Sequence, residues 1–276
     1  MKDVLALLSP GVGDRLSAAA RYALGLASAY DARLSVLIAG IESIDYAPEP
    51  DIRQAGGASV EPPSASERLE LTAKFVLSAA KAAGVSCETV APDDEFRSLR
   101  ERVIHSAQLR DVLIVDSYGP LQPPRKDLVD GVLFGSGRPL VLVPQGVGEF
   151  AGERIVIAWD ATRAAVRAVH DALPLLVRAR DVTVVSVADD KTISTPGTGD
   201  ALCRHLRQWN IASKFVAVNR EELAVGTALL TYARKAGANL LVMGGFAHGF
   251  ERELMLGSAT RDVYRANLEI PVLLSH

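Results

Sequence analysis

The chain has 276 residues, of which 49% are hydrophobic, 23% charged and 5% aromatic. This length predicts about two domains, and the composition excludes a disordered chain, a collagen-like chain and a coiled coil. Thirty basic and 33 acidic residues give a net charge of −3. That balance does not provide the basic surface of a nucleic-acid-binding protein.

Cysteine content and hydropathy predict a cytoplasmic protein. Cys87 and Cys203 are the only cysteines, too few for a disulfide scaffold or a metal cage, and they fit a reducing compartment. The apolar stretch at the N-terminus is too short for a secretion signal, and no run of about 18 apolar residues could span a membrane. None of the five histidines has a cysteine or carboxylate at metal-ligand spacing, so no metal site is expected.

The predicted elements begin alike in the two halves of the chain. An apolar strand at 3–9 and an amphipathic, alanine-rich helix at 14–30 open the first half. The same pair recurs at 154–160 and 163–177 in the second half. Repetition of this kind indicates one structural unit present twice.

Further strands are nearly continuous apolar runs, found at 34–41, 112–115, 155–159, 182–187 and 240–243. Such runs are typical of parallel strands covered on both faces by helices. Helical patterns alternate with them, at 66–83, 94–109, 199–209, 220–236 and 258–266. The sequence therefore predicts an α/β fold of two doubly wound domains, each with five parallel strands and four helices.

Each half closes with a similar apolar strand, at 139–143 and 271–275. Both would be edge strands that need covering. A glycine-rich segment at 145–153 has no periodicity and separates a domain at 1–148 from a domain at 153–276. One difference between the halves is a proline-rich insertion at 45–65, predicted as a surface loop.

Ligands of open parallel sheets bind beyond the carboxyl ends of the strands, where the chain order reverses. After the fourth strand of the second half, Gly244 and Gly245 begin a glycine-containing segment that ends in Gly257-Ser258 at the start of the last helix. Free N–H groups there would favour an anion such as phosphate. The alternative is that Gly257 breaks a helix and Ser258 caps its second part.

Asp160 follows the first strand of the second half, in the run Trp159-Asp-Ala-Thr162. A carboxylate at this place can accept hydrogen bonds from ribose hydroxyls. The alternative is that Asp160 caps the following helix. Asp160 joins the glycine segment only if the first and fourth strands are neighbours.

These residues resemble the universal stress protein family. Its nucleotide-binding members carry G-x2-G-x9-G-[ST] after the fourth strand, with an Asp ending the first, and this chain has Gly244-x2-Ala247-x9-Gly257-Ser258. The whole chain looks like a tandem member, in which two fused domains replace a dimer. The resemblance implies an adenine nucleotide α-hydrolase-like fold with strand order 3-2-1-4-5 in each half and an intrachain pseudo-dimer. Whether two such chains associate further as a homodimer is left open by the sequence.

The resemblance also implies ATP or a related adenine nucleotide as ligand, with or without Mg²⁺, in the second half. The implied nucleotide-binding residues are Asp160, Ala161, Val187, Gly244, Ala247, His248, Gly257, Ser258, Ala259 and Thr260. Ala247 departs from the motif, since a methyl group narrows the loop and disfavours positive φ. His248 could touch a phosphate, and a solvated loop histidine is the alternative.

The first half departs further from the family pattern. Its first strand ends in Ser9 without the carboxylate, and its fourth ends in Asp116 at the position of Gly244. Asp116 would repel a phosphate, and Gly135-Ser136 lies too close to Pro139 to open a helix. The first half is therefore interpreted as a degenerate, non-binding domain.

The predicted function is a nucleotide-binding stress or signalling protein without efficient catalysis, since no base is placed to activate water. Slow ATP hydrolysis or autophosphorylation is compatible with it. The main alternative is a non-nucleotide scaffold that dimerises or docks a partner, favoured by Ala247. A ligase-like or phosphatase-like enzyme is a third alternative, but the S-G-G-x-D-S loop of such ligases is missing.

Overall fold

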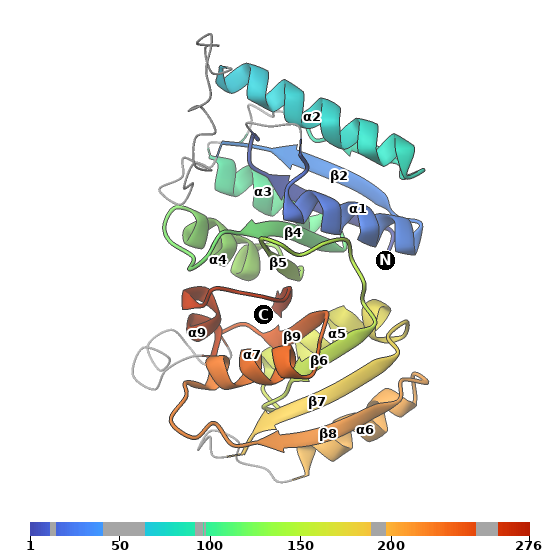
Figure 1. The fold of residues 1–276 in the computed structure, drawn as a ribbon, viewed down its shortest axis with the longest axis vertical. Helices are drawn as coiled ribbons and strands as arrows, with labels where there is room; N and C mark the ends of the chain where they lie inside the picture. The colour runs from blue at the N-terminus through green and yellow to red at the C-terminus, as the bar shows by residue number, and fades with distance from the viewer. Residues whose placement is uncertain (12–14, 41–63, 92–95, 97, 189–196, 247–258) are drawn as a thin grey trace, which may run out of the picture.

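The computed structural model describes residues 1–11, 15–40, 64–91, 96, 98–188, 197–246 and 259–276. Its strands form one ten-stranded sheet in the order β3-β2-β1-β4-β5-β10-β9-β6-β7-β8. Figure 1 shows the N-terminal half, blue to green, above the C-terminal half, yellow to red. The two halves meet at the centre of this sheet.

The N-terminal half has its elements in strict alternation: β1 (Asp3–Leu8), α1 (Ala18–Tyr30), β2 (Arg33–Ile38), α2 (Ala65–Ala82), β3 (Cys87–Thr89), α3 (Leu99–Gln108), β4 (Val112–Ser117), α4 (Arg125–Gly135) and β5 (Leu140–Pro144). The C-terminal half repeats the alternation: β6 (Arg154–Ala158), α5 (Arg163–Leu176), β7 (Asp181–Val187), α6 (Thr198–Arg207), β8 (Ser213–Val218), α7 (Val225–Lys235), β9 (Leu240–Gly244), α9 (Ala259–Arg265) and β10 (Val272–Ser275).

The strand order confirms the predicted architecture. Within each half the strands are parallel and follow the order 3-2-1-4-5. The closing strands β5 and β10 pair antiparallel, with Leu273 opposite Val141. Each apolar edge strand therefore covers the other, and the two expected sheets become one.

Alternating strand side chains divide the core between the two faces of the sheet. Val4, Ala6 and Leu8 of β1 pack with α1 and its neighbours in one cluster. Leu5 and Leu7 point to the other face and pack among residues of α3, α4 and α9. Among the described helices, none is both long and apolar enough to cross a membrane.

Hydroxyl caps set where several helices begin. The Ser17 hydroxyl accepts a hydrogen bond from the Ala20 N–H at the start of α1. Ser98 caps α3 in the same way, which starts this helix at Leu99 although the sequence pattern predicted a start near residue 94. A side-chain oxygen at this position satisfies an N–H that has no partner within the helix.

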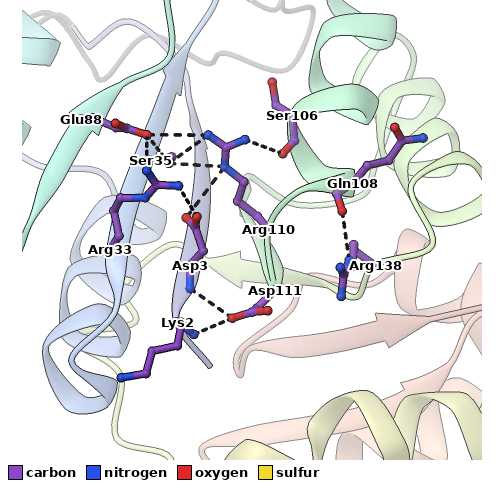
Figure 2. A network of polar contacts seen from close by, with 10 residues as sticks. All are labelled: Lys2, Asp3, Arg33, Ser35, Glu88, Ser106, Gln108, Arg110, Asp111 and Arg138. Atoms are coloured by element: carbon purple, nitrogen blue, oxygen red, sulfur yellow. Dashed lines mark hydrogen bonds and ion pairs between the residues drawn. The ribbon is translucent and has the colours of Figure 1, made fainter.

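A polar network joins the amino ends of the strands in the N-terminal half (Figure 2). The guanidinium of Arg110 lies 3.8 Å from Asp3, 3.7 Å from Glu88 and 3.3 Å from the hydroxyl of buried Ser35. Asp111 accepts hydrogen bonds from the first strand's backbone N–H groups. Because β5 and β10 pair antiparallel, this amino edge of the N-terminal half continues into the carboxyl edge of the C-terminal half.

The segment between β5 and β6 crosses helix α1. The ring of Phe150 packs edge-on against Tyr22, with centroids 5.4 Å apart, and lies 6.1 Å from Tyr30. A side chain at Gly25 would approach the Phe150 backbone nitrogen to 2.9 Å, so glycine is required where the two segments cross. The connection that the sequence predicts as a domain boundary is thus packed against the N-terminal half.

Candidate functional site

The candidate site lies at the carboxyl ends of three adjacent strands of the C-terminal half. Strand β6 pairs with β9 on one side, where Ile157 is opposite Val242, and with β7 on the other. Asp160 follows β6, Val187 ends β7 and Gly244 ends β9. The topology therefore brings these sequence-predicted residues to one edge of the sheet.

Asp160 does not cap helix α5 itself, but it hydrogen-bonds to Thr162, the residue that does. Its Oδ1 accepts hydrogen bonds from the Thr162 N–H at 2.9 Å and the Thr162 hydroxyl at 2.6 Å. The Thr162 hydroxyl in turn accepts from the Ala165 N–H and caps the helix. Asp160 is half-buried, and its Oδ2 accepts no hydrogen bond from the described part of the chain. With respect to the described residues, this oxygen is left for a ligand hydroxyl.

Ala161 lies between Asp160 and Thr162 with a φ of 61°. This left-handed conformation turns the chain sharply from the strand into the helix, and its side chain is exposed. The turn sets the direction in which the neighbouring carboxylate points.

Gly244 lets strand β9 pass directly against the start of α5. A Cβ at Gly244 would lie 2.6 Å from both the Ala164 carbonyl carbon and the Ala165 nitrogen. Both are backbone atoms, so a side chain would force the strand and helix apart. The glycine is therefore required for this contact, a reason that the motif alone does not reveal.

The next two residues form a tight, fully bonded turn. The Gly245 N–H donates to the Ser275 carbonyl at 2.7 Å. Phe246 has a left-handed φ of 49°, and its N–H donates to the Thr260 hydroxyl at 3.0 Å. Holding a phenylalanine in this region costs on the order of 1 kcal/mol, so surrounding contacts must maintain it.

The remaining predicted residues divide into those within and those outside the described chain. Thr260 is buried, and its hydroxyl ties the first turn of α9 to the Phe246 backbone. Ala259 is the first residue of that helix. Four predicted residues lie outside the described residues: Ala247, His248, Gly257 and Ser258.

The N-terminal half has different side chains at the matching positions. Asp116 is opposite Val143, the fourth residue after Pro139, just as Gly244 is opposite the fourth residue after the second closing proline. Asp116 is 1% exposed, and its Oδ1 accepts from the Ala19 N–H in the first turn of α1 at 2.8 Å. The carboxylate thus lies where a ligand anion would meet the helix.

Arg125 is the second buried side chain at this strand end. Its guanidinium donates to the Asp116 carbonyl at 3.1 Å and to the Ser9 hydroxyl at 3.4 Å. It also lies 5.0 Å from the centre of the Tyr118 ring, and the residue is 4% exposed. A buried cation and a buried carboxylate therefore lie together at the carboxyl ends of β1 and β4.

Burial raises the pKa of Asp116 above the ordinary aspartate value. The Ala19 N–H, the Ser17 hydroxyl and the positive charge of Arg125 oppose this effect only in part. The carboxyl is held inside the protein by its partners at an electrostatic cost.

Sequence analysis missed the role of Arg125, although the sequence contains a signal for it. Arg125 precedes Pro139 by the same 14 residues by which Gly257 precedes Pro271. Gly135 and Ser136, in contrast, end α4 and cap its C-terminus, so they do not open a helix, as the spacing to Pro139 predicted.

Other reactive groups in the described part of the chain do not form a second centre. No group of three or more His, Cys, Asp or Glu side chains is arranged there to hold a metal. Cys87 and Cys203 are free thiols. Burial raises the pKa of Cys87 to about 11, which makes its thiol unreactive at neutral pH.

Comparisons with known proteins agree with this fold. Residues 152–276 match the model of the universal stress protein family. A universal stress protein from Archaeoglobus fulgidus DSM 4304 shares the fold at 16% identity with a TM-score of 0.64, covering 98% of this chain and 95% of that one. A protein of Pseudomonas aeruginosa UCBPP-PA14, described as a universal stress protein, matches at 16% identity and a TM-score of 0.60, covering 99% and 92%. No curated protein sequence matches.

Proposed function

Because residues 152–276 belong to the universal stress protein family and the first half repeats their fold, we propose that the chain binds an adenine nucleotide in its C-terminal half only. The ligand is ATP or a related adenine nucleotide, with or without Mg²⁺. The site lies at the carboxyl ends of β6, β7 and β9.

One contrast supports this proposal most. The C-terminal half has a glycine and a carboxylate whose Oδ2 accepts no hydrogen bond from the described residues. The N-terminal half has Asp116 and Arg125 buried together at the matching strand ends. Asp160 Oδ2 accepts hydrogen bonds from the ribose hydroxyls. The glycine segment accommodates the phosphates because glycines let the backbone come close to them. Val187 borders the adenosine from β7.

The proposed role is binding and signalling, with ATP hydrolysis or autophosphorylation slow if present. Asp160, whose Oδ1 is already held by two hydrogen bonds from Thr162, is suited to accept hydrogen bonds from a ligand. Occupancy of the site would report nucleotide concentration to a partner.

The test is to measure binding directly. We expect mass spectrometry of the denatured purified protein to detect an adenine nucleotide, and calorimetry with Mg-ATP to give one site per chain. Gly257→Asp should abolish binding, because two like charges about 4 Å apart repel by roughly 4 kcal/mol at an effective dielectric near 20. The absence of both co-purified nucleotide and binding heat at millimolar ligand would contradict the proposal.

Asp160→Ala separates the carboxylate from the rest of the site. Thr162 still caps α5 in this variant, so we expect a folded protein with weaker nucleotide binding. Asp181→Asn is the matched control, because Asp181 is exposed at the opposite, amino end of β7. Equal affinity of the two variants would remove Asp160 from the site.

A non-nucleotide scaffold is the second candidate, favoured by Ala247 where the family motif has glycine. It predicts that the wild type binds no nucleotide. It also predicts that Gly257→Asp leaves assembly of the chain with its partners unchanged.

A further inference from the structure

The two halves meet through more than their central strands. Helix α4 of the N-terminal half contacts the Gly245–Phe246 turn that follows β9 in the other half. The rings of Phe134 and Phe246 have centroids 5.4 Å apart. A Cβ at Gly245 would lie 2.7 Å from the Leu133 side chain. Figure 1 shows α4 directly beside α9 at this junction.

The contact continues on the C-terminal side. The ring of Phe134 lies 4.8 Å from that of His276, whose Nδ1 is 2.9 Å from the Gly245 carbonyl. Phe246 also packs edge-on against Tyr264 of α9, with centroids 5.7 Å apart. Phe246 therefore lies between an aromatic ring from each half.

The opposite contact is also present. Helix α9 of the C-terminal half touches the segment that follows β4 in the N-terminal half. The Leu121 N–H donates to the Tyr264 carbonyl at 2.6 Å, and the Lys126 ammonium lies 6.0 Å from the Tyr264 ring centre. The segment after the fourth strand of each half is thus supported by the last helix of the other.

The contact falls on a strained point of the chain. Phe246 holds a left-handed backbone immediately before Ala247, which stands at the second glycine position of the family motif. Such a conformation persists in a non-glycine residue only where surrounding contacts determine it. Of these contacts, Thr260 and Tyr264 come from the same half, and Phe134 comes from the other.

We propose that Phe134 is a positioning residue for the nucleotide site of the opposite half. Its ring fixes the Gly245–Phe246 turn and so sets the direction in which the motif leaves β9. The affinity part of this proposal rests on the proposed function, whereas the effect on the turn does not. The N-terminal half, closed to ligand by its own side chains, would then act as a support whose displacement alters nucleotide affinity.

Phe134→Ala is a clean test because Phe134 is 51% exposed, so its truncation leaves the buried core intact. Phe134→Tyr keeps the ring and should restore the wild-type behaviour. Trp209→Ala is the matched control, since Trp209 is a 47% exposed aromatic side chain in the C-terminal half, outside these ring contacts.

The first measurement needs no nucleotide. Amide hydrogen exchange reports opening of the Gly245 and Phe246 N–H groups, which are bonded to Ser275 and Thr260. We expect Phe134→Ala to speed this exchange roughly fivefold or more, while Phe134→Tyr and Trp209→Ala leave it unchanged. Unchanged exchange in Phe134→Ala would overturn the proposal.

The second measurement is the dissociation constant for Mg-ATP by calorimetry. We expect it to rise roughly fivefold or more in Phe134→Ala and to stay at the wild-type value in the other two variants. Faster exchange with unchanged affinity would overturn the link to the nucleotide site. A wild type that binds no nucleotide, with exchange still accelerated in Phe134→Ala, would contradict the proposed function and leave the effect on the turn supported.

Discussion

The carboxyl ends of the first and fourth strands occupy equivalent positions in the two halves, but they carry different side chains. In the N-terminal half, Asp116 and Arg125 are buried at the carboxyl ends of β1 and β4. In the C-terminal half, Gly244 and half-buried Asp160 lie at the corresponding strand ends. Strand order therefore brings equivalent strand ends together in both halves, whereas a few side chains decide whether the chain's own charges occupy them.

The chemistry of the N-terminal strand ends supports this view. A helix N-terminus favours an anion because its first N–H groups have no partner within the helix. In the N-terminal half, Asp116 provides that anion by accepting from the Ala19 N–H. The corresponding helix of the other half begins against a glycine, which brings no charge of its own.

Among the substitutions that test the difference between the two halves, Gly244→Ala should lower stability most. The added methyl group would lie 2.6 Å from backbone atoms of α5, which cannot move aside as a side chain can. We expect the free energy of unfolding to fall by about 3 kcal/mol in urea denaturation, in the range of overpacked cores. Gly148→Ala is the control, since a Cβ there meets no atom within 4 Å.

Asp116→Ala tests the corresponding strand ends of the N-terminal half. It leaves the buried Ala19 N–H without an acceptor and leaves the Arg125 charge buried without its carboxylate neighbour. We expect the free energy of unfolding to fall by about 2 kcal/mol, the cost of an unsatisfied buried donor. Asp116→Asn keeps an oxygen acceptor and should lose less. Equal stability of the alanine variant and the wild type would mean that the buried carboxylate contributes nothing.

The pH dependence of stability tests the burial of Asp116 through a smaller effect. Burial raises the pKa of Asp116, so the folded state binds the proton more tightly than the unfolded state does. This group's contribution to the free energy of unfolding therefore falls as pH rises from about 3.9 toward the raised value, and is constant above it. We expect wild type to lose stability relative to Asp116→Asn across this window in denaturation series. A difference in the free energy of unfolding that stays constant with pH would mean that the pKa of Asp116 is not raised.

Most of the architecture could be predicted from the sequence because apolar runs and alternating helices encode a parallel α/β sheet directly. Prediction of the strand order depended on the resemblance to a known family, since periodicity does not show which strands are neighbours. Helix α3 begins at Leu99, later than predicted, because the hydroxyl cap of Ser98 outweighs a pattern that extends further back.

The sequence predicted which residues would gather at the candidate site's edge of the sheet, but not the contacts that they make. Asp160 and Gly244 stood out by motif and position, yet the support of Asp160 by Thr162 depends on a left-handed Ala161. Arg125 was missed because a lysine- and arginine-containing helix start normally faces solvent. Phe134 was missed because its partner is more than 100 residues away in the chain, and no local pattern records such a contact.

The amino edges of the two halves provide the smallest and most controlled comparison. Arg110 has a side chain only 14% exposed and contacts Asp3, Glu88 and Ser35 together, which links the starts of three strands (Figure 2). At the amino edge of the C-terminal half, the pair of Lys214 with Asp181 is a single exposed contact at 3.6 Å.

Truncation of each cation should therefore have unequal consequences. We expect Arg110→Ala to lower the free energy of unfolding by about 1 kcal/mol and Lys214→Ala by less than about 0.5 kcal/mol, because solvent screens the exposed pair. Added salt should reduce the Lys214 effect further and leave most of the Arg110 effect, since hydrogen bonds to a buried hydroxyl are screened less. Equal losses in urea denaturation would mean that the network acts as ordinary surface charge, and that the carboxyl strand ends alone distinguish the two halves.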